Sequence, residues 1–363
     1  MNYEYPEEAP ITIVVRRVIL MDFIANCQTT AMGNMPHTDI ESALNLALSL
    51  DMPFFPQLPK LEFSEDLYVL AADHFPGITI NMGNESIDFS YKLFSEELPG
   101  FIENMESEDF LSMSIKHSSI YHAFLNTDLA NFPAIRGQFM GPMSFGFRIT
   151  DENKKPIIYN DAVREIIYMF FAKKINFQFK QLSAKNNNVY IWLDEPSMEI
   201  LFGCFTGYTN LSAKQDYRTF LEMIEAPIGI HLCGNPDWSF LLSDMNIKML
   251  SMNAYGCGSM FTKYYDEINS FLLKGNIIAW GIVPTLKKLY DIETIEMLED
   301  KLETMWDYLA TKGIDKQLLL EQSLLTPASC CMVNNDGGKT VEDSFRLLTE
   351  LSLKIRRKYS LGV

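Results

Sequence analysis

The sequence predicts one domain, a single (β/α)8 barrel spanning residues 1–363. Short apolar runs alternate with longer segments of helical period, which is the pattern of a parallel sheet with helices between its strands. We find eight such runs, and eight strands followed by helices are typical of the TIM barrel. Because we find neither an internal repeat nor a flexible linker, the 47% hydrophobic composition is expected to build one core.

The predicted elements follow from the length and the period of each apolar run. Strands are short runs bounded by turn residues, and helices are longer amphipathic segments that begin at an Asp or Thr cap. The strands are 28–34, 53–58, 134–140, 189–194, 227–232, 248–253, 276–282 and 318–325. The clearest helices are 161–184, 291–311 and 341–358, with caps at Asp161, Asp291 and Thr340.

Two segments fall outside this alternation. Residues 61–133 separate the second and third strands and are too long for one crossover, so we expect an insertion that forms a lid over one end of the barrel. Within it, "GITINMGNESIDFS" predicts a hairpin that turns near Gly83 and Asn84. Residues 1–27 have no regular pattern and are interpreted as an N-terminal extension under the barrel.

Charge and cysteine content narrow the class of protein. A formal net charge of −17 argues against a nucleic-acid partner and against an anionic membrane surface, because both require clustered Lys and Arg. The best apolar run, 18–25, is too short to span a bilayer and contains Asp22. The six cysteines lack the spacing of a disulfide framework, which indicates a reducing compartment. We therefore predict a cytoplasmic protein.

The unusual polar residues converge on one face of the predicted barrel. In TIM barrels the chemistry lies at the carboxyl ends of the strands. The residues at those ends are Asn34 and His37 after the first strand, Asp194 and Glu195 at the fourth, His231 and Cys233 at the fifth, Asn253 at the sixth, and Cys330 and Cys331 after the eighth. This convergence predicts a single functional site.

The pair His231 and Cys233 has the character of a metal site, because imidazole and thiolate are ligands that zinc selects. A buried histidine beside an inert core thiol is the commoner fate of such residues. A further cysteine at the end of the predicted eighth strand favours the metal site over the buried, inert pair. Only one of Cys330 and Cys331 is expected to bind, because adjacent side chains point different ways, and Cys257 is a reserve ligand. Three protein ligands and an open position would make the zinc catalytic.

Carboxylates and a histidine complete the predicted site. Asp194 and Glu195 end a buried strand, and we interpret them as an anchor for a cationic group such as a substrate α-amine. A helix cap with a solvated acid is the structural alternative. Two roles stay open for His37: a cap for the helix beginning near Thr38, or an acid or base in catalysis. The segment 136–142 either ends a strand in a turn or lets the backbone approach a ligand.

Five motifs together resemble a known family. They are "TTAMGNMPHTD", "IRGQFMGPMSF", "IWLDEPSME", "IHLCGN" and "LLTPASCCM", and they occur in family order. Over residues 28–358 the chain resembles the catalytic barrel of cobalamin-independent methionine synthase. More broadly, it resembles the superfamily that includes uroporphyrinogen decarboxylase and corrinoid-dependent methyltransferases. The resemblance implies a zinc-dependent methyltransferase that methylates a zinc-bound thiol, homocysteine, in methionine biosynthesis.

The resemblance also implies a ligand set for the zinc. His231 and Cys233 match the first two family ligands, and Cys330 matches the last one. Cys331 is an alternative because the spacing from the preceding proline differs by one residue. The third family ligand is a glutamate, and Asn253 stands at its place here. Since a neutral amide is a poor zinc ligand, Asn253 either replaces the ligand weakly or leaves the position to another group.

For the substrate, the resemblance implies that Asp194, with Glu195 beside it, binds the amino group of homocysteine. Asn34 stands where the family has a serine near the substrate carboxylate, and the backbone around Gly33 and Asn34 would hold that carboxylate. The additional amino-terminal barrel that helps the family hold folate has no room in this chain. The methyl donor is therefore expected to be a methylated corrinoid, free or on a corrinoid protein, or methyltetrahydrofolate.

Two rival hypotheses remain. A uroporphyrinogen decarboxylase-type lyase needs a basic cleft, and only Arg136 and Arg148 lie near the strand ends. A non-catalytic protein that binds a thiol or a corrinoid is kept open by Asn253. Metal content separates the methyltransferase from the lyase, and methyl transfer to a thiol separates it from the binding protein.

Overall fold

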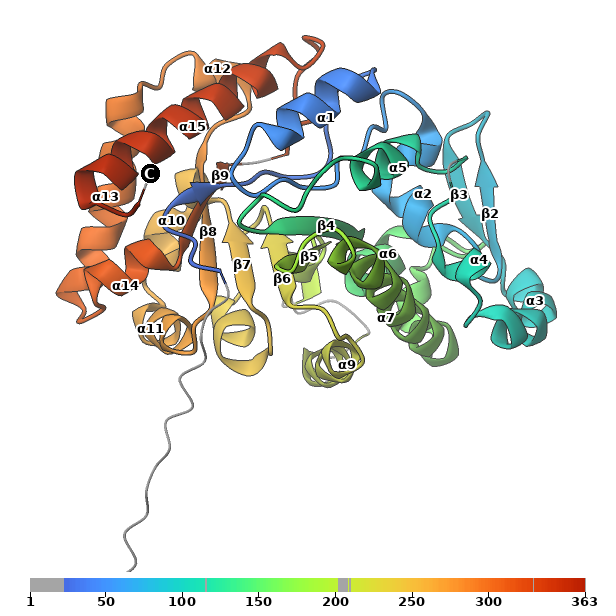
Figure 1. Ribbon diagram of the computed structural model, residues 1–363. Coiled ribbons are helices and arrows are strands. Elements are labelled where there is room, and N and C mark those ends of the chain that lie inside the picture. Colours follow the sequence, from blue (N-terminus) through green and yellow to red (C-terminus); the bar gives the residue numbers. More distant parts are fainter. Residues whose placement is uncertain (1–22, 115, 202–207, 209, 329, 363) are drawn as a thin grey trace, which may run out of the picture.

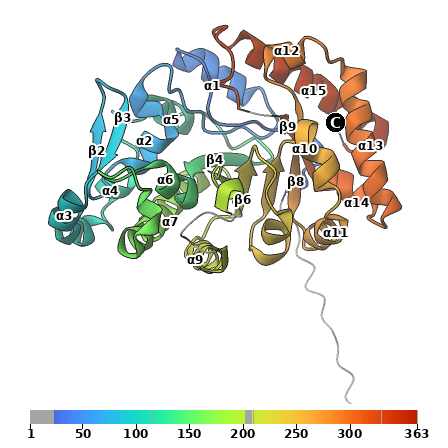
Figure 2. The same ribbon diagram turned by 180° about the vertical axis from the view of Figure 1, so that it is seen from behind.

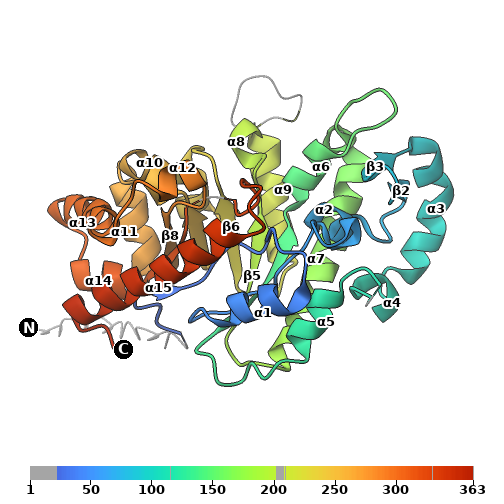
Figure 3. The ribbon, with the colours of Figure 1, turned by 90° about the horizontal axis from the view of Figure 1, so that it is seen from above.

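A curled parallel sheet forms the centre of the molecule (Figures 1 and 3). The computed structural model describes residues 23–114, 116–201, 208, 210–328 and 330–362. Seven parallel strands follow the order β1-β9-β8-β7-β6-β5-β4, and helices cover the outer face of the sheet. The strands are β1 (Gln28–Thr29), β4 (Ile135–Met140), β5 (Val189–Asp194), β6 (Ile228–Leu232), β7 (Met249–Met252), β8 (Ile277–Val283) and β9 (Ser323–Pro327).

The strands from β4 to β8 agree with the predicted ones to within one residue at each end. Their sequences are almost uninterrupted apolar runs, because a strand with helices outside it and packed side chains inside the curl is buried on both faces. The predicted α/β fold is thus confirmed as a barrel-like parallel sheet. Of the predicted first strand, 28–34, only the first two residues form regular β structure.

The predicted strand 53–58 is wrong as a regular strand. Isolated bridges join Phe54 to Arg136 and Asn34 to Gln57, so this segment lies between β4 and the chain that follows β1. Hydrogen bonds reach both neighbours, from the Gln57 N–H to the Gly33 carbonyl (2.8 Å) and from the Phe55 N–H to the Arg136 carbonyl (3.0 Å). The two prolines of the segment, at 53 and 56, lack the N–H donors that a continuous ladder needs.

The predicted strand 318–325 is also wrong in its first half. Residues 316–321 form helix α14 (Lys316–Glu321), and β9 begins only at Ser323. The Asp315 side chain caps this helix by accepting a hydrogen bond from the Leu318 N–H (2.7 Å). A short apolar run fits a buried strand and a buried helix equally well, and here the cap decides between them.

The long segment 61–133 contains the predicted hairpin and several helices. Strands β2 (Ile78–Asn81) and β3 (Ser86–Phe89) pair antiparallel, which confirms the hairpin. The Asn81 carboxamide accepts hydrogen bonds from the N–H groups of Gly83 and Asn84, which fixes the turn. The other elements are η1 (Phe63–Glu65), α2 (Leu67–Ala72), α3 (Tyr91–Asn104), α4 (Glu108–Leu111) and α5 (Ser119–Leu125).

This segment packs against one side of the sheet. Helix α2 packs on β4, and the hairpin and α3 lie at the periphery of the molecule, as Figures 1 and 2 show from opposite sides. Lys174 of α7 (Asp161–Ser183) ties the segment to the barrel, because its buried ammonium group donates to the carbonyls of Leu70 and Asp73. A lid function for this segment stays a prediction.

The three clearest predicted helices are present, but their caps differ. Asn160 caps α7, Thr294 caps α13 (Ile295–Thr311), and Gly338 precedes α15 (Lys339–Tyr359) with a φ of +95°. The predicted caps Asp161, Asp291 and Thr340 are therefore wrong. The remaining helices are α1 (Ile40–Leu48), α6 (Pro142–Arg148), α8 (Met198–Leu201), α9 (Asn210–Glu222), α10 (Ala254–Phe261), α11 (Tyr265–Leu273), α12 (Lys287–Tyr290) and the short η2 (Ile157–Tyr159) and η3 (Phe240–Asp244).

Two hydrophobic clusters hold the fold together. The larger one lies between the helices and the sheet, and the smaller one lies inside the curl, where Met249 and Leu324 pack with Trp192. Phe23 and Ala25 join this inner cluster, whereas residues 1–22 of the predicted extension lie outside the described part of the chain. None of the helices that the structure describes is long and apolar enough to cross a membrane.

Candidate active site at the carboxyl ends of the strands

The register of the sheet places the predicted site residues at one edge. Asp194, the last residue of β5, lies beside His231 of β6, and Leu232 lies beside Met252 of β7. The residues that follow β6 and β7 therefore leave the sheet at the same level. All the strands run parallel, so this edge is the carboxyl-terminal face at which barrel enzymes bind their substrates.

His231 and Cys233 are in contact. The His231 Nε2 atom lies 3.0 Å from the Cys233 sulfur, and its Nδ1 atom lies 2.9 Å from the Ser251 hydroxyl oxygen. Burial, together with the charge of Arg136, lowers the pKa of His231 to about 3, so the imidazole is neutral near pH 7. A neutral imidazole with one nitrogen held by a hydroxyl is the form that binds a metal through the other nitrogen.

Cys330 lies next to this pair, and the two adjacent cysteines differ in burial. Burial raises the pKa of Cys233 to about 12, and the charge of Asp194 also raises it, whereas the backbone N–H of Cys330 lowers it. Cys330 is half-buried, while Cys331 is fully buried and belongs to the large hydrophobic cluster. The two thiols point to different environments, as the sequence predicts for adjacent residues, and which of them binds a metal stays a prediction.

The predicted ligands are of the types that zinc binds, but only two of them, His231 and Cys233, are in contact. One imidazole and one thiolate precursor are in contact, which is the nitrogen and sulfur combination that zinc selects. Across the described ranges, however, no group of three or more His, Cys, Asp or Glu side chains is arranged to hold a metal ion. The side-chain oxygen of Asn253 caps α10 by accepting a hydrogen bond from the Gly256 N–H (2.8 Å), and a role of Asn253 as a metal ligand stays a prediction.

Asp194 carries a free carboxylate oxygen in a buried setting. The side chain is 7% exposed, and its Oδ2 atom accepts a hydrogen bond from the Gln138 Nε2 atom (2.7 Å). The Oδ1 atom is buried and has no hydrogen-bond partner in the described part of the chain. Burial raises the pKa of Asp194 to about 6, although Arg136 and Gln138 oppose the rise. A buried carboxylate oxygen that lacks a donor is suited to a ligand that brings a donor or a positive charge.

Glu195 is engaged within the protein. Its carboxylate accepts hydrogen bonds from the N–H groups of Met143 and Ser144 and from the Ser144 hydroxyl (2.6 Å). These donors lie in the first turn of α6, and an added Cβ on Gly141 would lie only 2.1 Å from the Glu195 carboxyl carbon. Burial raises the pKa of Glu195 to about 7, and these donors oppose the rise. Glu195 therefore holds α6 against β5, and its role toward a substrate stays a prediction.

Gly33 is linked to Asp194 through the side chain of Gln138, and Asn34 follows Gly33 in the chain. The Gly33 N–H donates to the Oε1 atom of Gln138 (2.8 Å), the residue that also binds Asp194. The side-chain oxygens of Asn34 and Gln57 are also buried, and neither has a hydrogen-bond partner among the described residues. An added Cβ on Gly33 would lie 2.3 Å from the Gln57 Oε1 atom and 2.5 Å from the Gln138 Oε1 atom, so a larger residue would displace these side chains. Among the described residues, the side-chain oxygens of Asn34, Gln57 and Asp194 thus lack donors, and these residues belong to segments that contact Gly33 or Gln138.

From the sequence, Gln57 lies at the end of the predicted second strand and Gln138 falls in the segment 136–142, but the contact of Gln138 with Asp194 is not predicted. Arg136 and Gln138 lie two residues apart on β4. Because successive side chains of a strand point to opposite faces, these two share one face of the strand. Their contact with Asp194 depends on the register between β4 and β5, which pairs Met140 with Asp194. A sequence gives the alternation but not the register, so the contact was not visible from the residues.

His37 is buried next to the start of α15. Its Nε2 atom lies 3.3 Å from the Glu342 carboxylate, and its Nδ1 atom has no partner. The left-handed Gly338 passes close by, since an added Cβ there would lie 3.0 Å from the ring. The predicted capping role is wrong, because Asp39 caps α1 by accepting from the Ser42 N–H (2.8 Å). A role of His37 as acid or base stays a prediction.

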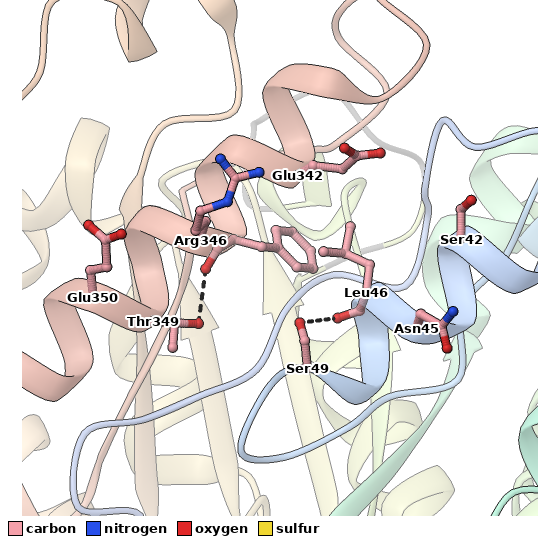
Figure 4. Close-up of a pocket in the computed structure, with 9 residues that line it drawn as sticks. Ser42, Asn45, Leu46, Ser49, Glu342, Arg346, Thr349 and Glu350 are labelled. Carbon is pink, nitrogen blue, oxygen red and sulfur yellow. Dashed lines mark hydrogen bonds between the residues drawn. The ribbon is translucent and has the colours of Figure 1, made fainter.

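A groove on the outer wall is separate from this site. It lies between α1 and α15 and is lined by residues such as Ser42, Glu342 and Thr349 (Figure 4). The hydroxyls of Ser49 and Thr349 donate to carbonyls one turn back in their own helices. These polar groups are already satisfied, and none of the lining residues is among the predicted ligands.

Comparison with solved structures shows where this fold occurs. One similar solved structure is a B12-independent methionine synthase from Shewanella sp. W3-18-1 in complex with selenomethionine. It is 14% identical to this chain, with a TM-score of 0.55 over 92% of this chain and 99% of that one. A methyltransferase from Methanosarcina mazei is 13% identical, with a TM-score of 0.52 over 92% and 94%.

Sequence comparison adds no further relative. No protein-family model matches the chain, and no curated protein does. At the identities found, the structural likeness concerns the fold, and it extends over nearly the whole of both matched proteins. The chain therefore has the fold of a methionine synthase and of a methyltransferase, as the resemblance of its five motifs implies.

Proposed function

We propose that this protein is a methyltransferase of the methionine synthase-like kind that methylates a thiol, homocysteine. The observation that carries the proposal is the placement of two complementary groups at one sheet edge. Asp194 offers a buried carboxylate oxygen without a donor, and the adjacent strand offers the His231–Cys233 pair. An ammonium group and a sulfur atom on one small substrate would satisfy both.

The substrate would be bound mainly by its amino-acid end. The free Oδ1 atom of Asp194 would accept a hydrogen bond from the substrate ammonium group, a charge-assisted contact. The backbone around Gly33 and Asn34 would hold the carboxylate. Anchoring both groups fixes the direction of the side chain, so that its sulfur points toward His231 and Cys233. Such positioning turns a bimolecular encounter into an oriented, near-unimolecular step.

Zinc is the metal that the donor types support. His231, Cys233 and Cys330 would hold it, with Cys331 as the alternative to Cys330, and the ligand loop after β9 would complete the set. When bound, zinc supplies an electrophilic centre that lowers the pKa of a coordinated thiol, so that the sulfur is nucleophilic at neutral pH. The hydroxyl of Ser251 would keep the Nε2 atom of His231 available for the metal.

The reaction is a nucleophilic displacement at the methyl carbon. The substrate thiolate forms the new S–CH3 bond, and the bond between the methyl group and the donor breaks, with the electron pair leaving on the donor. The donor would be a methylated corrinoid or methyltetrahydrofolate, and a corrinoid protein would be a natural partner. Asp194 and His231 are both buried, and such surroundings would limit the access of water to the substrate sulfur.

The lyase alternative loses its main candidate for substrate binding. A decarboxylase of a polycarboxylate needs exposed cations at the strand ends. Arg136 is fully buried, with its guanidinium 4.1 Å from the centre of the Trp192 ring and 5.0 Å from that of the Phe54 ring. It is therefore held within the barrel and does not reach a substrate carboxylate at the mouth.

Metal analysis followed by titration with homocysteine tests this proposal. Protein purified without chelator should contain near-stoichiometric zinc, and His231→Ala and Cys233→Ala should lose it. Cys27→Ala is the matched control, because it removes a buried thiol at β1, away from the mouth. Protein that is zinc-free and cannot be loaded would overturn the proposed ligand set, and absence of homocysteine binding would overturn the substrate.

A further inference from the structure

Arg136 is a buried cation that contacts no carboxylate among the residues that the structure describes. Its guanidinium lies between the rings of Trp192 and Phe54, its Nε atom donates to the Thr30 hydroxyl (3.1 Å), and one terminal nitrogen donates to the Gln138 Oε1 atom (2.9 Å). A fully buried charge is costly unless another charge compensates it. The nearest compensation along this chain of contacts is Asp194, which Arg136 reaches through Gln138.

The hydrogen bonds around Gln138 allow only one orientation of its side-chain amide. Its Oε1 atom accepts from Arg136 and from the Gly33 N–H, both of which are donors only. Its Nε2 group must therefore face Asp194, and it donates to the Oδ2 atom (2.7 Å). A flipped amide would set two donors against its NH2 group and leave the carboxylate facing an oxygen. The orientation of the amide follows from this network.

We propose that Arg136 and Gln138 are positioning residues that set Asp194 for a cationic substrate group. Arg136 fixes the amide of Gln138, and that amide holds Oδ2 of Asp194, which leaves Oδ1 facing the ligand. The Gly33 N–H joins the network, so the loop that would hold the substrate carboxylate is tied to the same amide. The inference rests on the proposed function, because it assigns this network to the binding of the substrate ammonium group.

Without the network, Asp194 would lose both its orientation and its compensating charge. A carboxylate held by one hydrogen bond has a defined free oxygen, whereas a carboxylate with no fixed donor can rotate and presents its charge less well. The Gly33 loop would also lose the acceptor of its N–H group. Any loss through this loop is shared by both thiols, because both carry a carboxylate, whereas the loss through Asp194 is specific to the ligand that carries an amine.

Gln138→Met tests the inference, because methionine has a similar length but neither donates to Asp194 nor accepts from Arg136. Binding of homocysteine and of 4-mercaptobutanoate, the same thiol without the amine, should be measured by calorimetry on zinc-loaded protein. We expect homocysteine affinity to fall about 10- to 100-fold, the range of a charge-assisted hydrogen bond, while 4-mercaptobutanoate binding changes less than about 3-fold. Arg136→Lys keeps the charge without the planar fork and should show a smaller loss of the same kind.

Gln178→Met is the matched control. Gln178 is an equally buried glutamine that donates to the backbone carbonyl of Gln138 from α7, on the helix side of the sheet. This variant should lose stability without discriminating between the two thiols. Equal losses for both thiols in Gln138→Met, or no loss, would overturn the inference.

A measurement without ligand separates failure of this inference from failure of the proposed function. If the wild-type protein binds neither thiol, the proposed substrate is wrong. The network is then tested by a double-mutant cycle of Gln138→Met and Asp194→Asn in urea unfolding of the ligand-free protein. Coupling of the two changes would support the positioning of Asp194, and additive effects would overturn it. If Gln138→Met does not fold, Gln138→Leu replaces it in both experiments.

Discussion

The two sides of the barrel mouth differ in how completely the chain itself holds them. On the amine side, defined as Gly33, Asn34, Gln138 and Asp194, the Asp194 carboxylate and the Gly33 N–H are both tied to the Gln138 amide. On the sulfur side, defined as His231, Cys233 and Cys330, the first two touch, but no third donor is set with them in the described residues. The amine side is preorganised, whereas on the proposed function a bound zinc ion would bring the ligands of the sulfur side together.

This difference follows from the elements that carry each side. Asp194 and Gln138 lie within strands, where ladder hydrogen bonds fix the direction of each side chain. Cys330 lies in the loop after β9. Loops adopt alternative conformations more easily than strands do. We therefore expect substitutions on the sulfur side to act through metal retention, and those on the amine side to act through substrate selectivity.

The cysteine pair gives the largest expected effect. Cys330→Ser should remove zinc almost completely, because a hydroxyl does not replace a thiolate ligand. Cys331→Ser should retain zinc but lose about 1–3 kcal/mol of unfolding free energy, since it buries a hydroxyl in the hydrophobic cluster. Zinc content and urea denaturation of both variants check this. Zinc loss in Cys331→Ser alone would move the ligand by one residue and place Cys330 outside the sulfur side.

Asp194→Asn should have the next largest effect. Replacing the anion by an amide removes a charge-assisted contact with the substrate ammonium group, worth about 1.5–3 kcal/mol, or roughly 10- to 150-fold in affinity. Binding of 4-mercaptobutanoate should be insensitive, and zinc content should not change. If both thiols lose affinity equally, Asp194 supports the fold or the metal, and the division into two sides does not hold.

The pH dependence of substrate binding should reflect the same carboxylate. Because burial raises the pKa of Asp194 to about 6, the group is anionic above that pH and neutral below it. Ammonium binding is therefore present at pH 7 and is lost as the pH falls through about 6, with affinity falling up to about tenfold per unit. The ratio of homocysteine to 4-mercaptobutanoate affinity, measured from pH 7.5 to 5, isolates this titration. A constant ratio would exclude Asp194 as the amine anchor.

Asn253→Ala should have the smallest effect. The side chain of Asn253 caps α10, and loss of such a cap costs about 0.5–2 kcal/mol of stability. Because this side chain is turned toward the Gly256 N–H, zinc retention and thiol affinity should be unchanged. Asn253→Asp keeps the capping oxygen and serves as the control. Zinc loss in Asn253→Ala would instead make this residue a member of the sulfur side.

The sequence predicts the strands that carry the site better than the contacts between them. Residues 189–194 and 228–232 are apolar runs that end in polar groups, so both the strands and the face on which they end follow from the pattern. The run "LLLE" before β9 gives no such signal, because apolar residues of that length fit a helix or a strand. The caps that decide such cases are single hydrogen bonds, which a periodic pattern does not contain.

The network of Arg136, Gln138 and Asp194 shows what lies beyond prediction from the residues. Each of the three falls on a predicted strand, and the alternation on β4 places Arg136 and Gln138 on one face. Their contacts arise from the pairing of β4 with β5 and from the approach of the Gly33 loop across the barrel. Both are tertiary relations between segments that lie more than fifty residues apart in the chain.

Transfer of a labelled methyl group tests the central claim most directly. Zinc-loaded protein is incubated with homocysteine and with either labelled methylcobalamin or labelled methyltetrahydrofolate, and labelled methionine is measured. We expect the wild-type protein to form methionine from at least one donor, and Cys233→Ala to form it only at the uncatalysed level. Equal methionine formation by the wild-type protein and Cys233→Ala, or none above background from either donor, would contradict it.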